Sequence, residues 1–297
     1  MRILITGGTG LIGQALCKHW QQQGHELWVW SRRPQAVAAL CSGARGIATL
    51  EELPTDVELD AVINLAGAPI ADSRWSDARR QLLLRSRIEL TRTLVDWMTR
   101  QAMPAPVLIS GSAVGWYGNQ GDQLLDETSA SGPADFGSEL CNAWEEEAER
   151  ARQWGVRVVL VRTAPVLSST GGMLGKLRLP FSLGLGGRLG SGQQWMPWIH
   201  LQDEVALIDF LLQHPECSGV FNACAPGLVR NAEFTKALAH ALNRRTFLPA
   251  PAWVLRLALG EMSVLLLGGQ RLQPRRAQEA GFVFRYPELG GALAQLM

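Results

Sequence analysis

A glycine-rich segment after the first apolar run has the residue types needed to hold a pyrophosphate. Residues 6–13 read TGGTGLIG and satisfy both G-x-G-x-x-G and G-x-x-G-x-x-G. Glycine serves where a turn is tight, where backbone approaches phosphate and where a helix packs closely on a strand, and the helix N-terminus adds free N–H groups. A glycine-rich turn needs no ligand, but its place between a strand pattern and a helix pattern favours dinucleotide binding. The residues expected to contact the dinucleotide here are Gly7, Thr9, Gly10, Leu11, Ile12 and Gly13.

The residues at the end of the second expected strand indicate which nicotinamide dinucleotide, NAD or NADP, the chain binds. Proteins that bind NAD carry Asp or Glu there to hold the ribose 2′-hydroxyl, whereas this chain has Ser31, Arg32 and Arg33. A hydroxyl and a guanidinium are suited to a 2′-phosphate. A solvated basic turn before Pro34 would look the same. We favour NADP(H), with Ser31 and Arg32 as its contacts.

The first two hundred residues alternate short apolar runs with helical patterns, which is typical of parallel βαβ units. Strands are expected at residues 2–6, 26–30, 46–49, 61–65, 106–110, 156–161 and 219–223, and helices at 11–23, 77–100, 139–154 and 203–213. Seven parallel segments joined by crossovers predict an α/β fold with a doubly wound parallel (Rossmann) sheet. The acid-rich run at 145–149 is expected on the solvated side of its helix.

Residues 168–198 are rich in glycine and show little periodicity, which predicts a functional loop without regular structure. We assign 1–228 to the dinucleotide-binding domain with this loop, and 247–297 to a smaller, mainly helical segment on the substrate side. Arginines and tryptophans in the loop suit an anionic, nucleotide-linked or aromatic ligand. A flexible excursion that completes the core is the alternative. The expected substrate contacts are Trp195, Trp198 and His200, although a histidine at a strand end is often structural.

Composition narrows the remaining possibilities. The 297 residues carry 28 Lys and Arg against 27 Asp and Glu, and this balance argues against nucleic acid or an anionic membrane as the main partner. The five cysteines and five histidines show no metal-ligand spacing, so we expect no metal. With neither a leader nor an apolar run of membrane-spanning length, we expect a cytoplasmic protein whose partner is a small-molecule substrate. The oligomeric state stays open.

Several motifs together resemble one protein family. They are Thr6–Gly13, Ser31–Arg32, Asn64–Gly67, Ser86–Arg87, Ser112 with Gly115–Gly118, Trp144–Glu145, Pro180–Phe181, Leu183–Gly187, Gly190–Gly192 and Pro197–His200. Along essentially its whole length the chain resembles the extended short-chain dehydrogenase/reductases, the NAD-dependent epimerase/dehydratase family, and most of all an atypical "epimerase family protein" branch. The resemblance implies that Leu65, Ala66 and Gly67 approach the cofactor's adenosine and ribose. Arg87 either reaches the cofactor or is a surface arginine.

The proton-transfer residues of that family are missing. Its members normally combine a Ser or Thr with Y-x-x-x-K on one helix, where the lysine lowers the pKa of the tyrosine. In the matching stretch Phe136 stands in place of the tyrosine and Leu140 in place of the lysine, and neither tyrosine of the chain is followed four residues later by a lysine. Ser112 and Tyr117 are the catalytic candidates that remain, although a turn hydroxyl and a packing tyrosine would look alike. The sequence therefore predicts an NADP(H)-binding oxidoreductase or epimerase of unknown substrate, or else a non-catalytic NADPH-binding sensor or interaction protein.

Overall fold

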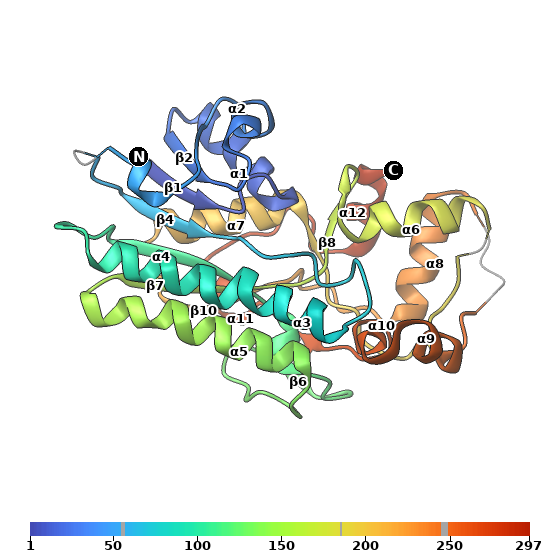
Figure 1. The fold of residues 1–297 in the computed structure, drawn as a ribbon. Helices are drawn as coiled ribbons and strands as arrows, with labels where there is room; N and C mark the ends of the chain where they lie inside the picture. Colours follow the sequence, from blue (N-terminus) through green and yellow to red (C-terminus); the bar gives the residue numbers. More distant parts are fainter. Residues whose placement is uncertain (55–56, 185, 245–248) are drawn as a thin grey trace.

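A seven-stranded parallel sheet forms the centre of the protein (Figure 1). The computed structural model describes residues 1–54, 57–184, 186–244 and 249–297. The strands are β1 (Arg2–Thr6), β2 (Glu26–Trp30), β3 (Arg45–Ile47), β4 (Ala61–Asn64), β5 (Val107–Ala113), β7 (Arg157–Thr163) and β10 (Gly219–Ala223), in the spatial order β10-β7-β5-β4-β1-β2-β3. The chain winds outward on both sides of β1, which confirms the predicted doubly wound fold. The strand order reverses between β1 and β4, where such sheets bind ligands.

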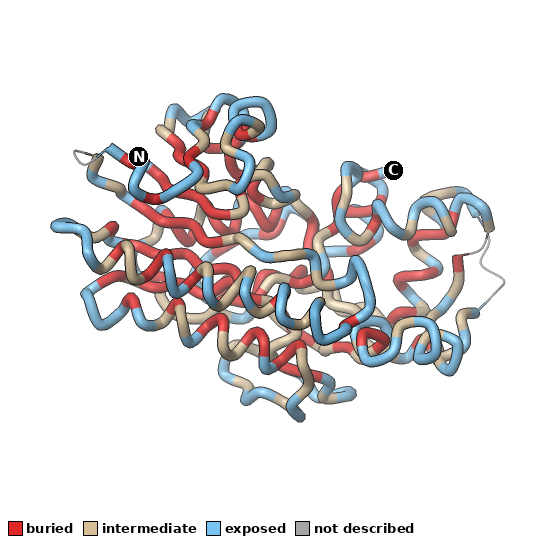
Figure 2. The backbone as a smooth tube through the Cα atoms, in the orientation of Figure 1, coloured by how far each residue is buried: buried red, intermediate tan, exposed pale blue. Residues whose placement is uncertain are grey.

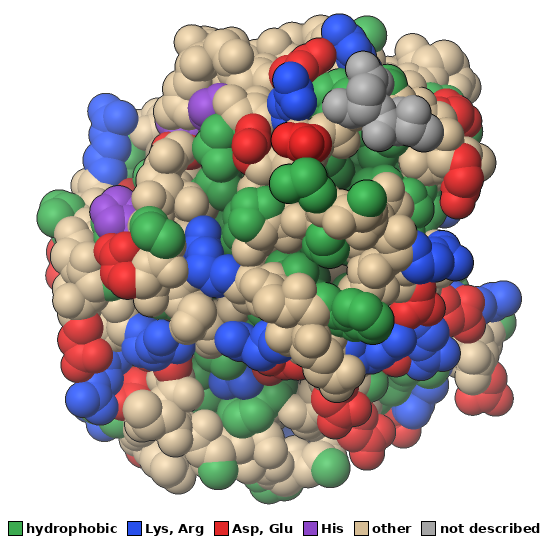
Figure 3. Space-filling model, turned by 90° about the vertical axis from the view of Figure 1, so that its left-hand side faces the viewer, with side chains coloured by type: hydrophobic (Ala, Val, Ile, Leu, Met, Phe, Trp, Pro, Cys, Tyr) green, Lys and Arg blue, Asp and Glu red, His purple; other side chains and the backbone are tan. Residues whose placement is uncertain are grey.

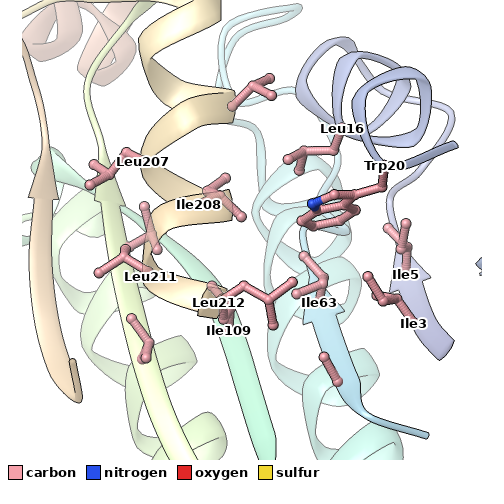
Figure 4. Close-up of a cluster of buried hydrophobic side chains, with 14 of the residues drawn as sticks. Ile3, Ile5, Leu16, Trp20, Ile63, Ile109, Leu207, Ile208, Leu211 and Leu212 are labelled. Carbon is pink, nitrogen blue, oxygen red and sulfur yellow. The ribbon is translucent and has the colours of Figure 1, made fainter. Parts of the chain in front are cut away.

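Helices cover both faces of the sheet because each buried strand has apolar side chains on both sides. One face carries α1 (Leu11–Gln22), α7 (Leu201–Gln213) and α11 (Arg275–Glu279), and the other carries α4 (Leu90–Thr99) and α5 (Phe136–Glu149). Successive residues of β1 point to opposite faces, so that Ile3 and Ile5 pack with Trp20 of α1 while Leu4 joins the core under α4 and α5. Figure 4 shows the first of these cores, in which Leu207 and Leu211 of α7 and Trp20 of α1 pack over strand residues such as Ile63 and Ile109.

A second lobe stands beside the carboxyl ends of the strands. Its elements are β8 (Val166–Ser168), α6 (Gly172–Ser182), β9 (Ile199–His200), α8 (Asn231–Ala241), α9 (Ala252–Leu259), α10 (Val264–Leu267) and α12 (Leu289–Leu296). Leu174, Phe181, Phe234 and Leu293 form its own apolar core. In Figure 2 the tube is red through the central sheet and mostly pale blue or tan along α9 and α10 at the lobe's edge. The short elements that remain are α2 (Val37–Leu40), α3 (Asp77–Leu84), β6 (Leu124–Leu125) paired with β11 (Arg271–Leu272), and 3-10 turns at Pro34–Ala36, Leu50–Glu52, Val114–Tyr117, Arg150–Trp154 and Gly260–Ser263.

Two expectations from the sequence are wrong. Residues 168–198 are not a loop without regular structure, since α6 occupies eleven of them. Its glycines and the internal Pro180 weaken the helical pattern, and packing of Leu174 and Phe181 against the second lobe outweighs that weakness. Glu145 does not lie on the solvated side of α5, because it is only 7% exposed.

Two further expectations meet the structure in part. The helix expected at 77–100 is divided into α3 and α4 by a π-helical turn at Arg85–Glu89. Of the segment expected at 247–297, residues 249–297 carry α9 to α12, and residues 247–248 lie outside the described part of the chain.

The surface carries both signs of charge. On the face shown in Figure 3, lysine and arginine side chains are interspersed with aspartate and glutamate, and neither sign forms a continuous patch. No helix in the described ranges is long and apolar enough to cross a membrane. Nor do His, Cys, Asp or Glu side chains of the described residues gather in threes that could hold a metal ion.

Glu204 on α7 is a fully buried carboxyl group. Its Oε1 accepts a hydrogen bond from the Thr163 hydroxyl at 2.8 Å, and its Oε2 has no partner among the described residues. Burial raises the pKa of Glu204 from 4.5 to about 8. The folded protein therefore holds a proton here that the unfolded chain releases above about pH 4.5, so this group's contribution to stability falls as the pH rises from 4.5 towards 8.

Glu204→Gln is expected to become more stable relative to the wild type as the pH rises, because glutamine keeps the acceptor for Thr163 and does not ionise. The difference in free energy of unfolding should grow by about 1 kcal/mol per pH unit between about pH 5.5 and 7.5. Urea unfolding at each pH measures it. The exposed Glu216→Gln is the control and should show no such trend. A difference for Glu204→Gln that does not change with pH would show that the carboxyl is already ionised in the folded state.

Candidate functional site

The glycine-rich segment forms a tight turn between β1 and α1 with no room for side chains. Gly7 has a φ of +71°, and a Cβ there would lie 2.5 Å from the carbonyl of Leu65. A Cβ on Gly13 would lie 2.3 Å from the Gly7 oxygen. The Gly10 amide donates to that oxygen at 2.9 Å, and no side chain caps α1. The N-terminal amides of α1 are therefore free to bind an anion, as a dinucleotide pyrophosphate requires.

A buried polar network fixes the end of β4 against this turn. The Thr6 hydroxyl donates to Asn64 Oδ1 at 2.7 Å and accepts from the Ala66 amide at 3.1 Å. Asn64 Nδ2 in turn donates to the hydroxyls of Thr91 and Ser110. Because each buried polar group finds a partner, the network holds residues 65–67 in one position beside Gly7. Of the three residues that the resemblance implies here, Leu65 and Ala66 lie against Gly7, and Gly67 lies next to Arg87.

The Arg87 side chain packs against the same segment. The π-helical turn directs its guanidinium against Gly67, where a Cβ would lie 2.9 Å from Arg87 Cζ, and Nη2 donates to the Ala68 oxygen at 3.0 Å. The neighbouring Ser86 hydroxyl accepts from the Ala68 amide. Burial lowers the pKa of Arg87. Arg87 is therefore a half-buried arginine that supports the backbone of Gly67 and Ala68. Turns of this π-helical kind are frequent at functional sites.

The end of β2 leaves its cationic groups available. Ser31 Oγ accepts a hydrogen bond from the Arg33 amide at 3.1 Å, which turns the chain after the strand. Both Arg32 and Arg33 are exposed. In the described part of the chain neither guanidinium forms a hydrogen bond or an ion pair, so both are free to bind an anion.

A cavity of about 150 Å³ lies between the carboxyl ends of β5 and β7 and the second lobe. Gly115 and Pro165 line it from the sheet side, and Met196 and Leu265 from the lobe. Met173 of α6 lines it too. A Cβ on Gly172, the residue before Met173, would lie 3.1 Å from the side chain of Leu11, the first residue of α1. The cavity therefore lies close to the start of α1.

Of the three expected substrate contacts, only Trp195 lines this cavity. Its Nε1 donates to Asp122 Oδ1 at 2.7 Å, and the guanidinium carbons of Arg230 and Arg271 lie 4.4 and 5.0 Å from the ring centroid. Two cation–π contacts and a hydrogen bond fix the indole in one orientation. Trp198 instead is fully buried in the core of the second lobe, with Nε1 donating to the Gly227 oxygen.

His200 also lies away from the cavity. It caps the N-terminus of α7, where Nδ1 accepts from the Gln202 amide at 3.1 Å, and its Nε2 lies 2.9 Å from Gln295 Oε1. The ring packs on Tyr286, with the centroids 4.0 Å apart. Burial lowers the pKa of His200, so the neutral ring that this pattern requires is favoured. This geometry corresponds to the structural role that a histidine at a strand end often has.

Ser112 belongs to a buried group of charges between β5, β7 and α5. Its hydroxyl donates to Glu145 Oε1 at 2.6 Å, and Nε and Nη2 of Arg162 both donate to the same carboxylate at 2.8 Å. The Arg162 guanidinium also stacks 3.4 Å above the Trp116 ring centroid. Ser112 is 5% exposed and is not among the residues that line the cavity, and its proton points at Glu145, so it cannot donate to a substrate carbonyl at the same time.

Tyr117 is fully buried beside this group. Its hydroxyl donates to Asn222 Oδ1 at 2.8 Å, and burial raises the pKa of Tyr117 to about 12. A phenol of such a pKa keeps its proton near neutral pH, which favours packing over proton transfer.

The two residues that replace the tyrosine and the lysine of the family motif have apolar surroundings. Phe136 packs edge-on against Trp75, and Leu140 is 1% exposed.

The sequence does not reveal site residues whose partners lie far away along the chain. Glu145 and Arg162 form the central ion pair, and the one signal that could have found it is an arginine inside the apolar run of β7, which needs a buried acid. Gly115, Met173 and Met196 line the cavity from three separate segments. No local pattern marks them.

Comparisons with known proteins agree with this geometry. Residues 3–224 match the model of the NAD dependent epimerase/dehydratase family, and residues 250–296 match a domain of unknown function, DUF1731. The chain is similar to the epimerase family protein Mb2239 of Mycobacterium bovis, with 42% identity covering 98% of this chain and 96% of that protein. It is similar to the human epimerase family protein SDR39U1, with 36% identity covering all of both chains, and to YfhF of Bacillus subtilis, with 37% identity covering 100% and 98%.

Two solved structures extend the likeness to three dimensions. The crystal structure of human SDR39U1 (isoform 2) with NADPH matches with a TM-score of 0.90 and 37% identity, covering 100% of this chain and 99% of that one. The nucleoside-diphosphate sugar epimerase of Corynebacterium glutamicum matches with a TM-score of 0.78 and 31% identity, covering 99% of this chain and 57% of that one.

Proposed function

Since the chain belongs to the NAD dependent epimerase/dehydratase family, we propose that it is a cytoplasmic NADP(H)-dependent oxidoreductase or epimerase with an altered proton-transfer apparatus. The observation that carries the proposal is the glycine turn before α1, which has no space for a side chain at Gly7 or Gly13 and leaves the helix amides free. The NADPH present in the human SDR39U1 crystal supports the choice of cofactor. The scattered and odd-numbered cysteines support a reducing compartment.

Each part of the site has a role in this proposal. The amides at the start of α1 bind the pyrophosphate, and Ser31 with Arg32 binds the 2′-phosphate. The backbone at 65–67, braced by Arg87, approaches the ribose and adenosine. Bound nicotinamide supplies hydride transfer. The cavity beside the turn admits the substrate and excludes water from it. Ser112 is not among the residues that line the cavity, and its hydroxyl holds the Glu145 carboxylate in place behind the wall.

The chain's preference for NADPH is expected to depend on Arg32. Wild-type protein should bind NADPH at least about tenfold more tightly than NADH, since a guanidinium–phosphate pair is worth about 1.4 kcal/mol or more. Arg32→Ala should remove the difference by weakening NADPH binding and leaving NADH binding unchanged. Isothermal titration calorimetry measures all four affinities.

Arg100→Ala is the matched control for Arg32→Ala, because it removes an equally exposed guanidinium at the end of α4. It should leave both affinities at the wild-type values. Arg33→Ala shows whether the neighbouring guanidinium shares the 2′-phosphate. Equal affinities of the wild-type protein for NADPH and NADH would overturn the choice of cofactor.

A second function is supported by the absence of proton-transfer residues. Phe136 and Leu140 are both packed into an apolar cluster, so no phenol or amine stands at the family's usual positions. A protein that binds NADPH and signals its level to a partner needs no such groups. Turnover separates the two: NADPH oxidation that rises with protein and substrate concentration supports the enzyme. Tight NADPH binding with no oxidation across alcohols, ketones and sugar nucleotides supports the sensor.

A further inference from the structure

The cavity beside the glycine turn has a composition that restricts what it can hold. We propose that it receives the substrate and that this substrate is a small, uncharged molecule with an apolar ring and a hydroxyl group, not a nucleotide-linked sugar. The inference rests on the proposed function in one respect, namely that the ligand in this cavity is the partner of NADP(H) in the reaction.

Volume is the first argument. The cavity measures about 150 Å³. An engineered apolar cavity of roughly 150 Å³ in another protein holds a single benzene molecule. One six-membered ring with a short substituent therefore fits inside it, whereas most of a nucleoside diphosphate joined to a sugar would have to lie outside the cavity.

The charge of the wall is the second argument. Methionine, valine, leucine and tryptophan side chains make up much of the lining, including Met173, Met196 and Leu265. No lysine, arginine or histidine is among the lining residues. The one lining carboxylate, Asp135, caps α5 by accepting from the Ser138 amide at 2.8 Å. A diphosphate or carboxylate placed here would lose its hydration with no cation to replace it, which is costly.

The polar groups of the wall suit a hydroxyl group on the ligand. Gln194 Nε2 donates to the oxygens of Leu189 and Leu266, and Gln270 Nε2 donates to the Gly118 oxygen at 2.8 Å. Asn231 uses both ends of its amide, accepting from the Leu189 amide and donating to Met196 Sδ. Gln194 uses both of its N–H groups, whereas Gln270 and Asn231 each use one of two on partners among the described residues, and the side-chain oxygens of Gln194 and Gln270 remain as acceptors. A wall that offers both donors and acceptors suits a ligand hydroxyl, which can donate and accept at once.

Gly115 offers a way to fill the cavity without disturbing the fold. It lines the cavity, and a Cβ there would meet only Cys141 Sγ at 4.0 Å. Its φ lies outside the left-handed region, so a larger residue is not strained. Gly290 on α12 is the matched control, because it is exposed, far along the chain, and a Cβ there would meet no atom within 4 Å.

The test uses the full chain, with 1-phenylethanol as the uncharged ring alcohol and UDP-glucose as the nucleotide-linked sugar. NADPH affinity is measured first by calorimetry, and each probe is then titrated into the NADPH-saturated protein by ligand-observed NMR. We expect 1-phenylethanol to bind and UDP-glucose not to bind. Gly115→Leu should weaken 1-phenylethanol binding by at least about tenfold, a loss of about 1.4 kcal/mol, when it is measured at an NADPH concentration that saturates the variant. Gly290→Leu should leave both 1-phenylethanol and NADPH binding unchanged.

Leu265→Asp is the second variant, because Leu265 lines the cavity and is 39% exposed, so the change puts a charge on the wall at little risk to folding. It should also weaken 1-phenylethanol binding. UDP-glucose that binds, or 1-phenylethanol that binds equally well to both cavity variants, would overturn the inference. Failure of NADPH itself to bind in the first titration would instead overturn the proposed function, so the two failures are distinguishable.

Discussion

Glu145→Ala is expected to lower the free energy of unfolding by about 3–5 kcal/mol, the usual cost of removing one partner of a buried ion pair. Glu145 is 7% exposed and accepts hydrogen bonds from Ser112 and from two nitrogens of Arg162. Arg162 is 3% exposed, and its Nη1 already has no partner among the described residues. Without the Glu145 carboxylate, the positive charge of Arg162 would stay buried against Trp116 with no negative charge to balance it. Urea unfolding monitored by tryptophan fluorescence measures the change.

The control for this prediction is Glu146→Ala, one residue further along α5. Glu146 is exposed, and its replacement is expected to cost less than about 0.5 kcal/mol. Removing both partners in Glu145→Leu with Arg162→Met should cost less than Glu145→Ala alone, because no charge remains buried. If Glu145→Ala unfolds at the same urea concentration as Glu146→Ala, the ion pair has no part in holding β7 to α5.

Gly13→Ala is expected to weaken NADPH binding at least about a hundredfold, which corresponds to roughly 2.7 kcal/mol. The new Cβ would lie 2.3 Å from the Gly7 oxygen and 2.6 Å from Gly8 Cα. Both are backbone atoms, so relief requires the turn to move away from α1, which misplaces the amides that bind the pyrophosphate. Calorimetric titration with NADPH measures the loss.

Gly290→Ala provides the comparison for Gly13→Ala, since it adds the same methyl group to another helix in open space. It should bind NADPH with wild-type affinity. Circular dichroism confirms that both variants keep their helices. Wild-type affinity in a folded Gly13→Ala protein would mean that the cofactor binds somewhere other than this turn.

The sequence predicts the cofactor half of the site because that half is local. Gly7 to Gly13 is one uninterrupted segment, and its strand, turn and helix follow one another, so spacing alone shows where phosphate would sit. Ser31 and Arg32 can also be identified from the sequence, since they come directly after a short apolar strand. The seven strands are recognised for the same reason, each as an apolar run between helical patterns.

The substrate half is not local, and there the sequence is a poor guide. Gly115, Met173, Met196 and Leu265 meet only after the second lobe docks on the carboxyl ends of the strands. Trp198 looks like a ligand contact in the sequence, but the lobe needs it as core. Glu145 is the sharpest case. In sequence it is one acid among several, and only its contact with Arg162 on a neighbouring strand separates it from the solvated Glu146.

A crystal structure of the NADPH complex tests the whole account most directly. We expect the pyrophosphate at the amides of Leu11 to Gly13, the 2′-phosphate within hydrogen-bonding distance of Ser31 and Arg32, and the nicotinamide ring at the entrance of the cavity beside Gly115. A 2′-phosphate that extends into solvent away from Arg32, or a nicotinamide ring that faces away from the cavity, would contradict it.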